Sequence, residues 1–214
     1  MRRTILALAL AATFVSGAVV LDRIAVIVGK HVIKLSDIDR DLRVTDFLNR
    51  APLDLSSQAK RQSAERLINQ QIIRQEIVNS GYRRPGESEA TRLEEQIAHD
   101  RYSGSDALLR QALARYGLTE GQLHEQLLWQ LTVLQFIDQR FRPGVFISDD
   151  EVRAYYEQHL GELRNENRKD NSFEALVSKI RSLLEGEQIN KDFADWLQEA
   201  RKNYRIEYKQ AAFA

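Results

Sequence analysis

The side chains of this sequence best suited to metal binding or proton transfer are histidines and clustered acids. The four histidines lie far apart, and none has the spacing of a known metal-binding motif. His124 and Glu120 form an i, i+4 pair on one predicted helix, which is either half of a metal site or a solvated pair on the helix surface. No third ligand is near in the sequence, which favours the solvated pair. Asp149, Asp150 and Glu151 begin a predicted helix, where the helix dipole favours acids without any catalytic role.

Motifs for other kinds of catalysis are absent from the sequence. There is no Gly-rich phosphate loop, no nucleophile elbow of the form G-x-S-x-G and no H-E-x-x-H zinc motif. The chain has no cysteine, which excludes thiol catalysis and thiolate-bound zinc. Lys plus Arg and Asp plus Glu both number 31, and this balance argues against a strongly basic nucleic-acid surface. We therefore predict no catalytic residues, no bound metal, no cofactor and no nucleic-acid partner.

The N-terminus has the pattern of a secretory signal peptide. Arg2 and Arg3 form a basic start, residues 4–15 are apolar, and residues 16–18 are small, as at a cleavage site. The alternative is an uncleaved membrane anchor, because the apolar stretch up to Leu21 is almost long enough to cross a bilayer. The small residues favour cleavage. We expect a soluble protein exported to a bacterial periplasm, with no stable membrane insertion after cleavage.

Hydrophobic periodicity predicts a mainly helical fold with one small antiparallel sheet. Residues 23–28 and 31–34 form a predicted β-hairpin, because Gly29 suits the first central position of a type II′ turn. Residues 204–209 alternate between apolar and polar, which is typical of a half-buried strand. A lone hairpin is marginal in water, so we expect this last segment to add a third strand and bring the two ends of the chain together.

The rest of the chain is predicted to form helices with recognisable start and stop signals. Ser36 is the predicted N-cap of a helix that ends near Asn49, and Gly81 follows a long helix that starts at Ser57. Gly186 is expected to interrupt the last helical region. The other predicted helices cover residues 87–101, 105–116, 119–142, 148–160, 173–184 and 193–204.

The longest helical segment, residues 117–144, is apolar on two sides. One stripe is formed by leucines, and the second by Trp129, Val133 and Phe136. Such a helix either lies centrally in the fold, with both stripes in the core, or exposes one stripe to a ligand. In the second case, this stripe is one wall of a groove for apolar peptide segments, with Tyr155 and Tyr156 as further contacts. Exposure of the second stripe favours the groove, and full burial favours the core. The leucine stripe consists of Leu123, Leu127, Leu131 and Leu134.

The order of these segments resembles the N-terminal domain of the SurA-type periplasmic chaperones, a pattern that also occurs in related parvulin-type foldases. The resemblance rests on the segments RIAVIVGKHVIKLSDID, ERLINQQIIRQEIVNSGYR and ARYGLTEGQLHEQLLWQLTVLQFIDQRF. ISDDEVRAYYEQH resembles the helix that leads toward the isomerase domain of the family. FADWLQEARKNYRIEYK resembles its closing helix and strand. Together, these segments cover nearly the whole chain after the signal peptide.

The parvulin isomerase domain of that family has no counterpart in this sequence. In the family, parvulin domains lie between the last two of these segments, whereas here the interval is a short polar stretch that is too small for a domain. The resemblance therefore implies a chaperone domain at residues 19–160, a linker at residues 161–171, and closing helices and a strand at residues 172–209 that pack back on the same domain. The signal peptide covers residues 1–18.

The function that the resemblance implies is ATP-independent binding of unfolded exported polypeptides. The usual clients of the family are precursors of outer-membrane β-barrels. Capture would be reversible and without a covalent step, so we do not expect an enzyme. Two alternatives stay open: an envelope scaffold or interaction protein that has kept the fold, and a peptidyl-prolyl cis–trans isomerase with an unrecognised site. The oligomeric state is also open, because two chains could exchange their closing helices across the linker.

Overall fold

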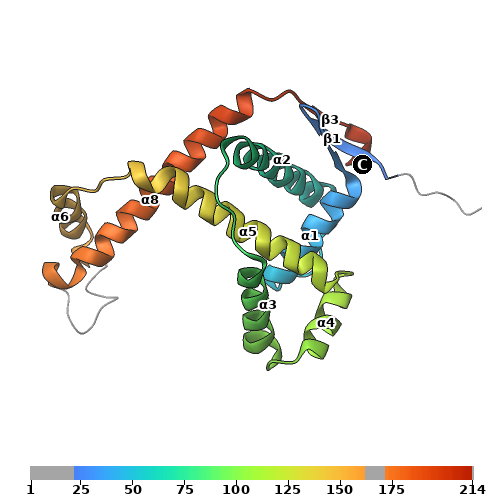
Figure 1. Ribbon diagram of the computed structural model, residues 1–214, viewed down its shortest axis with the longest axis horizontal. Helices are drawn as coiled ribbons and strands as arrows, with labels where there is room; N and C mark the ends of the chain where they lie inside the picture. Colours follow the sequence, from blue (N-terminus) through green and yellow to red (C-terminus); the bar gives the residue numbers. More distant parts are fainter. Residues whose placement is uncertain (1–21, 162–171, 214) are drawn as a thin grey trace, which may run out of the picture.

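The computed structural model describes residues 22–161 and 172–213. The predicted signal peptide at residues 1–18 and nearly all of the predicted linker lie outside these ranges. Within them, no helix is both long enough and apolar enough to cross a membrane. The fold is mainly helical with a small three-stranded antiparallel sheet, as the periodicity predicts (Figure 1).

The sheet joins the two ends of the described chain. Its strands are β1 (Ile24–Val28), β2 (His31–Lys34) and β3 (Ile206–Tyr208), arranged in the order β2-β1-β3 with antiparallel pairing throughout. In the β1–β3 pair, Val26 lies opposite Tyr208 and Val28 lies opposite Ile206. The prediction that the C-terminal strand completes the N-terminal hairpin is therefore confirmed.

A two-residue turn connects β1 to β2 and is tied to the C-terminal strand. Gly29 has a φ of 58°, whereas Lys30 does not have a positive φ, which is the φ pattern of a type II′ turn. The Gly29 amide donates a hydrogen bond of 2.9 Å to the Arg205 carbonyl, and the Lys209 amide donates one of 2.8 Å to the Ala25 carbonyl. These two bonds lie at either end of β3 and hold it against the hairpin.

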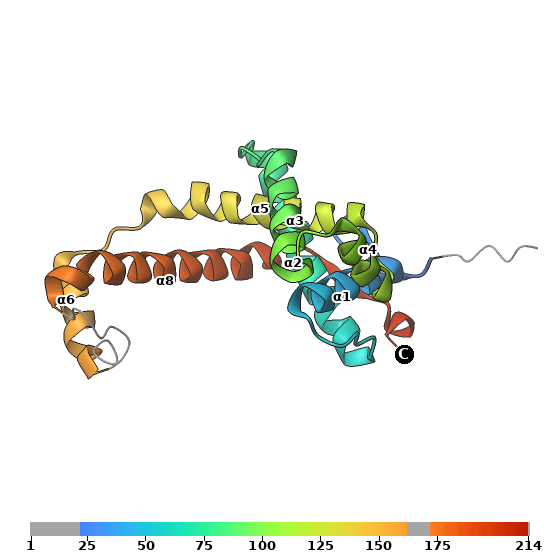
Figure 2. The same ribbon diagram turned by 90° about the horizontal axis from the view of Figure 1, so that it is seen from below.

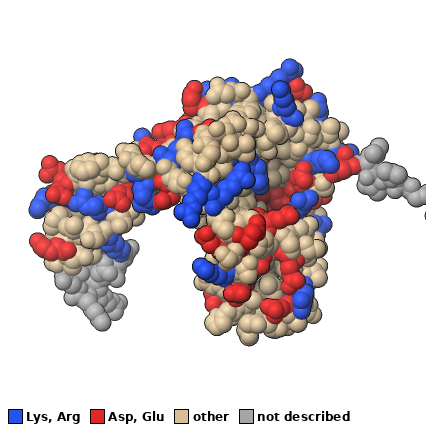
Figure 3. All heavy atoms as spheres, viewed as in Figure 1, with Lys and Arg blue, Asp and Glu red and all other residues tan. Residues whose placement is uncertain are grey.

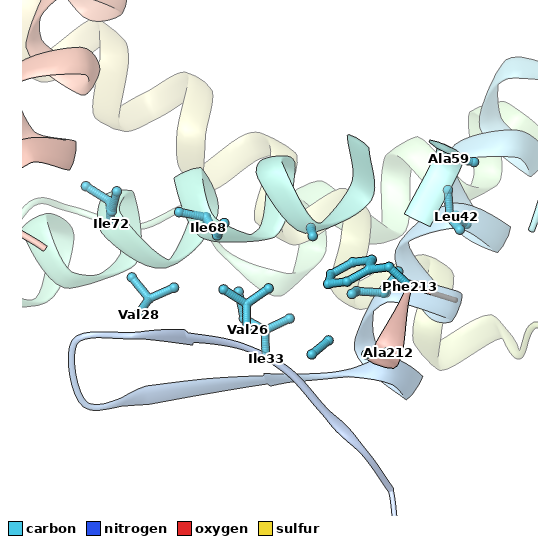
Figure 4. Close-up of a cluster of buried hydrophobic side chains, with 12 residues drawn as sticks. Val26, Val28, Ile33, Leu42, Ala59, Ile68, Ile72, Ala212 and Phe213 are labelled. Atoms are coloured by element: carbon cyan, nitrogen blue, oxygen red, sulfur yellow. The ribbon is translucent and has the colours of Figure 1, made fainter. Parts of the chain in front are cut away.

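One face of the sheet packs on α2 (Ser57–Ser80) and forms the first hydrophobic core (Figure 4). Val26 and Val28 point from β1 toward Ile68 and Ile72 of α2. Phe213, which follows the short 3-10 helix η2 (Gln210–Ala212), is fully buried beside them. The end of the described chain thus fills part of the core between the sheet and α2.

The first helix, α1 (Leu35–Asn49), begins before the predicted N-cap because Ser36 has another partner. Lys34 holds the N-cap position, and its backbone amide donates to the Asp37 carboxylate at 2.9 Å. The Ser36 hydroxyl donates instead to the Asp22 carboxylate, and this hydrogen bond is the main cause that lowers the pKa of Asp22. The prediction of Ser36 as the N-cap is therefore wrong. The Ser36 hydroxyl donates to Asp22, which precedes β1, and is not available to cap the helix.

The helices that follow, up to residue 158, agree with their predicted bounds to within a residue or two. The Ser56 side chain accepts a backbone amide at the start of α2, and Gly81 ends that helix with a φ of 67°. α3 (Glu87–Tyr102) and α4 (Asp106–Arg115) form a hairpin that projects from the body (Figure 1). The second core lies among α1, this hairpin and the start of the next helix. Its buried residues are Val44, Phe47, Ala90, Ala98, Leu109, Leu113, Leu118, Leu123 and Leu127.

Two long helices form an arm that extends from the body. α5 (Glu120–Phe141) and α8 (Phe173–Lys202) lie side by side, and α6 (Asp149–Gln158) packs on α8 at the far end of the arm (Figure 2). A short 3-10 helix, η1 (Arg142–Gly144), follows α5. The predicted break at Gly186 is wrong, because α8 runs through it. One glycine costs a helix only about 1 kcal/mol relative to alanine, and packing against neighbouring helices outweighs that cost.

Candidate functional site

Trp129, near the middle of α5, is the residue around which the candidate site is built. Its side chain packs against Ile73 and Ile77 of α2, and the residue is 8% exposed. The Arg74 guanidinium lies over the indole, with Cζ 3.7 Å from the ring centroid, which is a cation–π contact. Burial is the main cause that lowers the pKa of Arg74, and the charge of Arg84 is the second. Trp129 and Arg74 thus connect α5 to α2.

A hollow of about 510 Å³ opens beside Trp129, between α2, α5 and α8; we call it the arm hollow. Its lining is mostly apolar, and the polar part consists of amide side chains and Arg66, which is paired with Asp41. An apolar side chain of a ligand would lose water in this hollow, and the amides offer both hydrogen-bond donors and acceptors. The apolar lining residues are Ile73, Trp129, Val133, Leu134, Phe193 and Leu197. The amide residues are Asn69, Gln70, Gln126 and Gln130.

Two further hollows adjoin Trp129. The sheet-edge hollow, of about 250 Å³, lies between β2, α1, α2 and α5, and it shares Gln70, Gln126 and Trp129 with the arm hollow. The connection hollow, of about 520 Å³, lies where the chain between α2 and α3 passes α5. It shares Arg74, Glu125 and Trp129 with the sheet-edge hollow. We call the three hollows together the Trp129 groove.

The structure separates the three predicted groove residues of α5. Trp129 and Val133 line the arm hollow, but Trp129 is buried, at 8% exposed, and Val133 is half-buried, so the exposure that would favour a groove wall is not observed at Trp129. Phe136 is only 1% exposed and lines none of the three hollows. Its ring lies 5.1 Å from that of Tyr82 and 5.3 Å from that of Trp196, measured between centroids. Phe136 is therefore a core residue between α5 and α8 in this conformation.

Tyr155 and Tyr156 lie on α6, at the far end of the arm from Trp129 (Figure 1). The Tyr156 ring contacts Phe173 of α8 at a centroid distance of 5.4 Å, and the Tyr155 ring stacks on His159 at 4.0 Å. Both tyrosines are half-buried and belong to a separate small core of α6 and α8. The structure does not bring them to the Trp129 groove.

Several groove residues were not expected from the sequence. Leu134 was assigned to the leucine stripe, yet it is 64% exposed at the edge of the arm hollow. Phe193 and Leu197 reach the arm hollow from α8, and Arg74 of α2 lines the sheet-edge and connection hollows. No local signal identifies the last three, because their role depends on which helices pack together.

His124 of α5 is held by two carboxylates of α3 and not by the predicted Glu120. Its Nε2 lies 2.7 Å from the Glu87 carboxylate, and its Nδ1 lies 3.2 Å from the Glu94 carboxylate. Glu120 lies 3.8 Å from Arg110 instead. Only an imidazolium can donate from both ring nitrogens, and the pKa of His124 is raised, chiefly by its hydrogen bond to Glu87. Within residues 22–161 and 172–213, no cluster of three or more His, Asp or Glu side chains could hold a metal ion.

These contacts of His124 predict a pH-dependent contribution to stability. Because the pKa of His124 in the folded protein is raised above the ordinary histidine value of 6.5, the contribution is complete below that pH and is lost as the pH rises through the folded pKa. Replacing His124 by Gln should therefore lower the free energy of unfolding more at about pH 5.5 than at about pH 9. Urea unfolding of both proteins at the two pH values measures this. An equal difference at both values would contradict the prediction.

Comparisons with known proteins do not assign the chain to a family. A comparison with models of known protein families finds no match, and a comparison with curated proteins also finds none. The resemblance to the SurA-type chaperones thus rests on the order of the sequence segments, and it stays a prediction. The Trp129 groove is the feature from which a function can be argued.

Proposed function

We propose that the protein is an ATP-independent chaperone that binds unfolded exported polypeptides in the periplasm, with outer-membrane protein precursors among its clients. The observation that carries this proposal is the Trp129 groove, whose open hollows combine apolar side chains with glutamine amides. The pairing of β1 with β3 adds support, because the resemblance to the SurA-type chaperones implies such a clasp.

The groove can bind an extended chain without regard to its detailed sequence. An apolar side chain of the client enters the arm hollow and packs against Trp129, Val133 and Leu134. Each buried CH₂ group contributes about 0.8 kcal/mol. The amides of Gln126 and Gln130 can donate to client carbonyls and accept from client amides. Binding of this kind is reversible and needs no nucleotide.

Aggregation of an unfolded outer-membrane protein tests the proposal. The wild-type protein should suppress aggregation at a stoichiometric excess, and Leu134→Ser should weaken this suppression several-fold because it removes apolar area from the arm hollow. Leu108→Ser is the matched control, since Leu108 is also exposed, at 47%, and lies on α4 outside the groove. Both substitutions are at the surface, so stability should change by about 0.5 kcal/mol or less.

The outcomes separate the alternatives. No suppression by the wild-type protein would leave the scaffold as the better interpretation. If the protein speeds the cis–trans isomerisation of a short X-Pro peptide above the uncatalysed rate, the isomerase is the better interpretation. Equal loss in both leucine variants would place client binding outside the arm hollow.

A further inference from the structure

The outer edge of β3 carries backbone polar groups that have no partner in the described part of the chain. The two hydrogen bonds that hold β3 against the hairpin involve Arg205 and Lys209, so the odd-numbered residues of this segment face β1. Successive residues of a strand direct their backbone groups to opposite sides, so Ile206 and Tyr208 direct theirs away from β1. Because β3 is an outer strand, no described residue pairs with the N–H and C=O groups of these two.

An extended polypeptide is the ligand that matches this edge. Free N–H and C=O groups on alternate residues are the groups that bind a neighbouring strand, at a distance of about 4.8 Å. In β-strand addition, the main chain of the ligand supplies the affinity, and its alternate side chains supply the specificity. No residue of β3 lines a hollow of the Trp129 groove, so a strand bound here makes a separate contact.

The solvent face of this segment alternates in charge. Ile206 and Tyr208 pack on the core between the sheet and α2, so Arg205, Glu207 and Lys209 lie on the opposite face. The Glu207 carboxylate lies 2.8 Å from Nε of Arg205 and 3.3 Å from Nζ of Lys209. Figure 3 shows basic and acidic side chains together at the upper right, where Figure 1 places β1 and β3. This row of basic, acidic and basic residues discriminates among the strands that can add to the edge.

A second copy of the chain is a poor occupant of this edge. Two copies of β3 that pair antiparallel through both Ile206 and Tyr208 place Glu207 opposite its own copy. The same register places Arg205 opposite Lys209. Like charges directly opposite each other destabilise a strand pair. The charge row thus disfavours the register that uses both free residues.

A shift by two residues removes this repulsion but loses hydrogen bonds. In one shifted register a free residue lies opposite Tyr204, whose amide already donates to the Arg201 carbonyl at 3.1 Å. In the other it lies opposite Gln210, whose carbonyl already accepts from the Phe213 amide at 3.0 Å. A client segment has neither restriction.

We infer that an extended segment of a client adds to the sheet as a fourth strand, antiparallel to β3, through the backbone of Ile206 and Tyr208. The favoured segment has a basic residue opposite Glu207 and acidic residues opposite Arg205 and Lys209. The inference rests on the proposed function, because the added strand is part of an unfolded client. It gives that client a second contact, which depends on its main chain.

Amide hydrogen exchange at β3, followed by NMR on the full protein, tests this inference. The peptide acetyl-Thr-Glu-Val-Lys-Val-Glu-Thr-amide carries the favoured charges and places its valines opposite Ile206 and Tyr208. At a peptide concentration of about ten times its Kd, exchange of these two amides should slow about tenfold, because the bound state protects them. The Lys209 amide is already bonded to the Ala25 carbonyl, and its exchange should change little.

Methylation of the peptide backbone separates strand addition from binding through side chains. N-methylation of one valine removes a donor that faces β3, whereas N-methylation of the central lysine removes one that faces solvent. The first change should weaken binding about tenfold, and the second by about twofold or less. Equal losses from the two methylations would contradict strand addition.

The order of charges is tested with an isomer of the same composition, acetyl-Thr-Glu-Val-Glu-Val-Lys-Thr-amide. It should bind about fivefold more weakly, because it places a glutamate opposite Glu207 and its lysine opposite a basic residue. Glu207→Lys should reverse the preference between the two peptides. Glu95→Lys, at an exposed site on α3, is the matched control and should keep the preference of the wild-type protein. An unchanged preference in Glu207→Lys would contradict the assigned register.

The other occupants of the edge give different results. Slow exchange of the Ile206 and Tyr208 amides in the free protein that becomes faster on dilution would assign the edge to a second copy. Slow exchange at every protein concentration would mean that the chain itself covers the edge. Either result would overturn the inference.

Failure of this inference is distinguishable from failure of the proposed function. If neither peptide slows exchange at β3, the strand site is absent, and suppression of aggregation still tests the chaperone. If the first peptide slows exchange but the wild-type protein does not suppress aggregation, the edge binds a strand and the chaperone proposal is wrong.

Discussion

Replacing Phe213 by alanine is expected to lower the free energy of unfolding by about 3 kcal/mol. The ring is fully buried between the sheet and α2, in one cluster with Val26 and Ile68. Removing it deletes apolar contacts and leaves a cavity. We place the cost at the low end for such a substitution, because Phe213 follows a short 3-10 helix, which can relax more readily than the middle of a long helix. Urea unfolding measures the change.

A matched control separates this effect from a general cost of losing an aromatic ring. Phe146, between η1 and α6, is 86% exposed, and Phe146→Ala should change the free energy of unfolding by about 0.5 kcal/mol or less. A loss below about 1 kcal/mol for Phe213→Ala would mean that the last residues do not close the core.

Replacing Phe136 by alanine should cost about 4 kcal/mol of stability, because its ring lies among Tyr82, Phe141 and Trp196. This result would distinguish a core residue from a client contact. The sequence alone made Phe136 a candidate for the groove wall, whereas the structure covers it with α8.

The variant Phe136→Leu keeps the protein folded for the comparison, since it should cost roughly 1.5 kcal/mol or less. Client affinity of the folded fraction should be unchanged in this variant and lowered in Leu134→Ser. If Phe136→Leu leaves the stability unchanged but abolishes client binding, Phe136 is a client contact in the groove. That result would contradict its assignment to the core.

Local patterns predicted the sheet, but not how the chain closes it. The alternation of residues 23–28 and 204–209 and the glycine at position 29 are short-range signals, and the strands form where they predict. The residues after β3 have no periodicity, so the buried position of Phe213 could not be read from them. It follows from the register of β3 against β1, which is a long-range contact.

The candidate site was only partly visible for a similar reason. Helical spacing correctly places Trp129, Val133 and Phe136 on one side of α5, but it does not show what covers that side. Phe193 and Trp196 of α8 cover the end of the stripe that contains Phe136. Trp129 and Val133, at its other end, line the arm hollow. The packing of α8, which lies far along the chain from α5, decides which part of the stripe is open.

Binding of unfolded polypeptide at Trp129 is tested most directly by the fluorescence of this residue. The chain has two tryptophans, so Trp196→Phe leaves Trp129 as the single reporter and keeps an aromatic ring in the core. Titration with an unfolded outer-membrane protein should change the Trp129 emission to saturation over the concentrations that suppress aggregation. Unchanged emission across that range would contradict the claim, whether or not aggregation is suppressed.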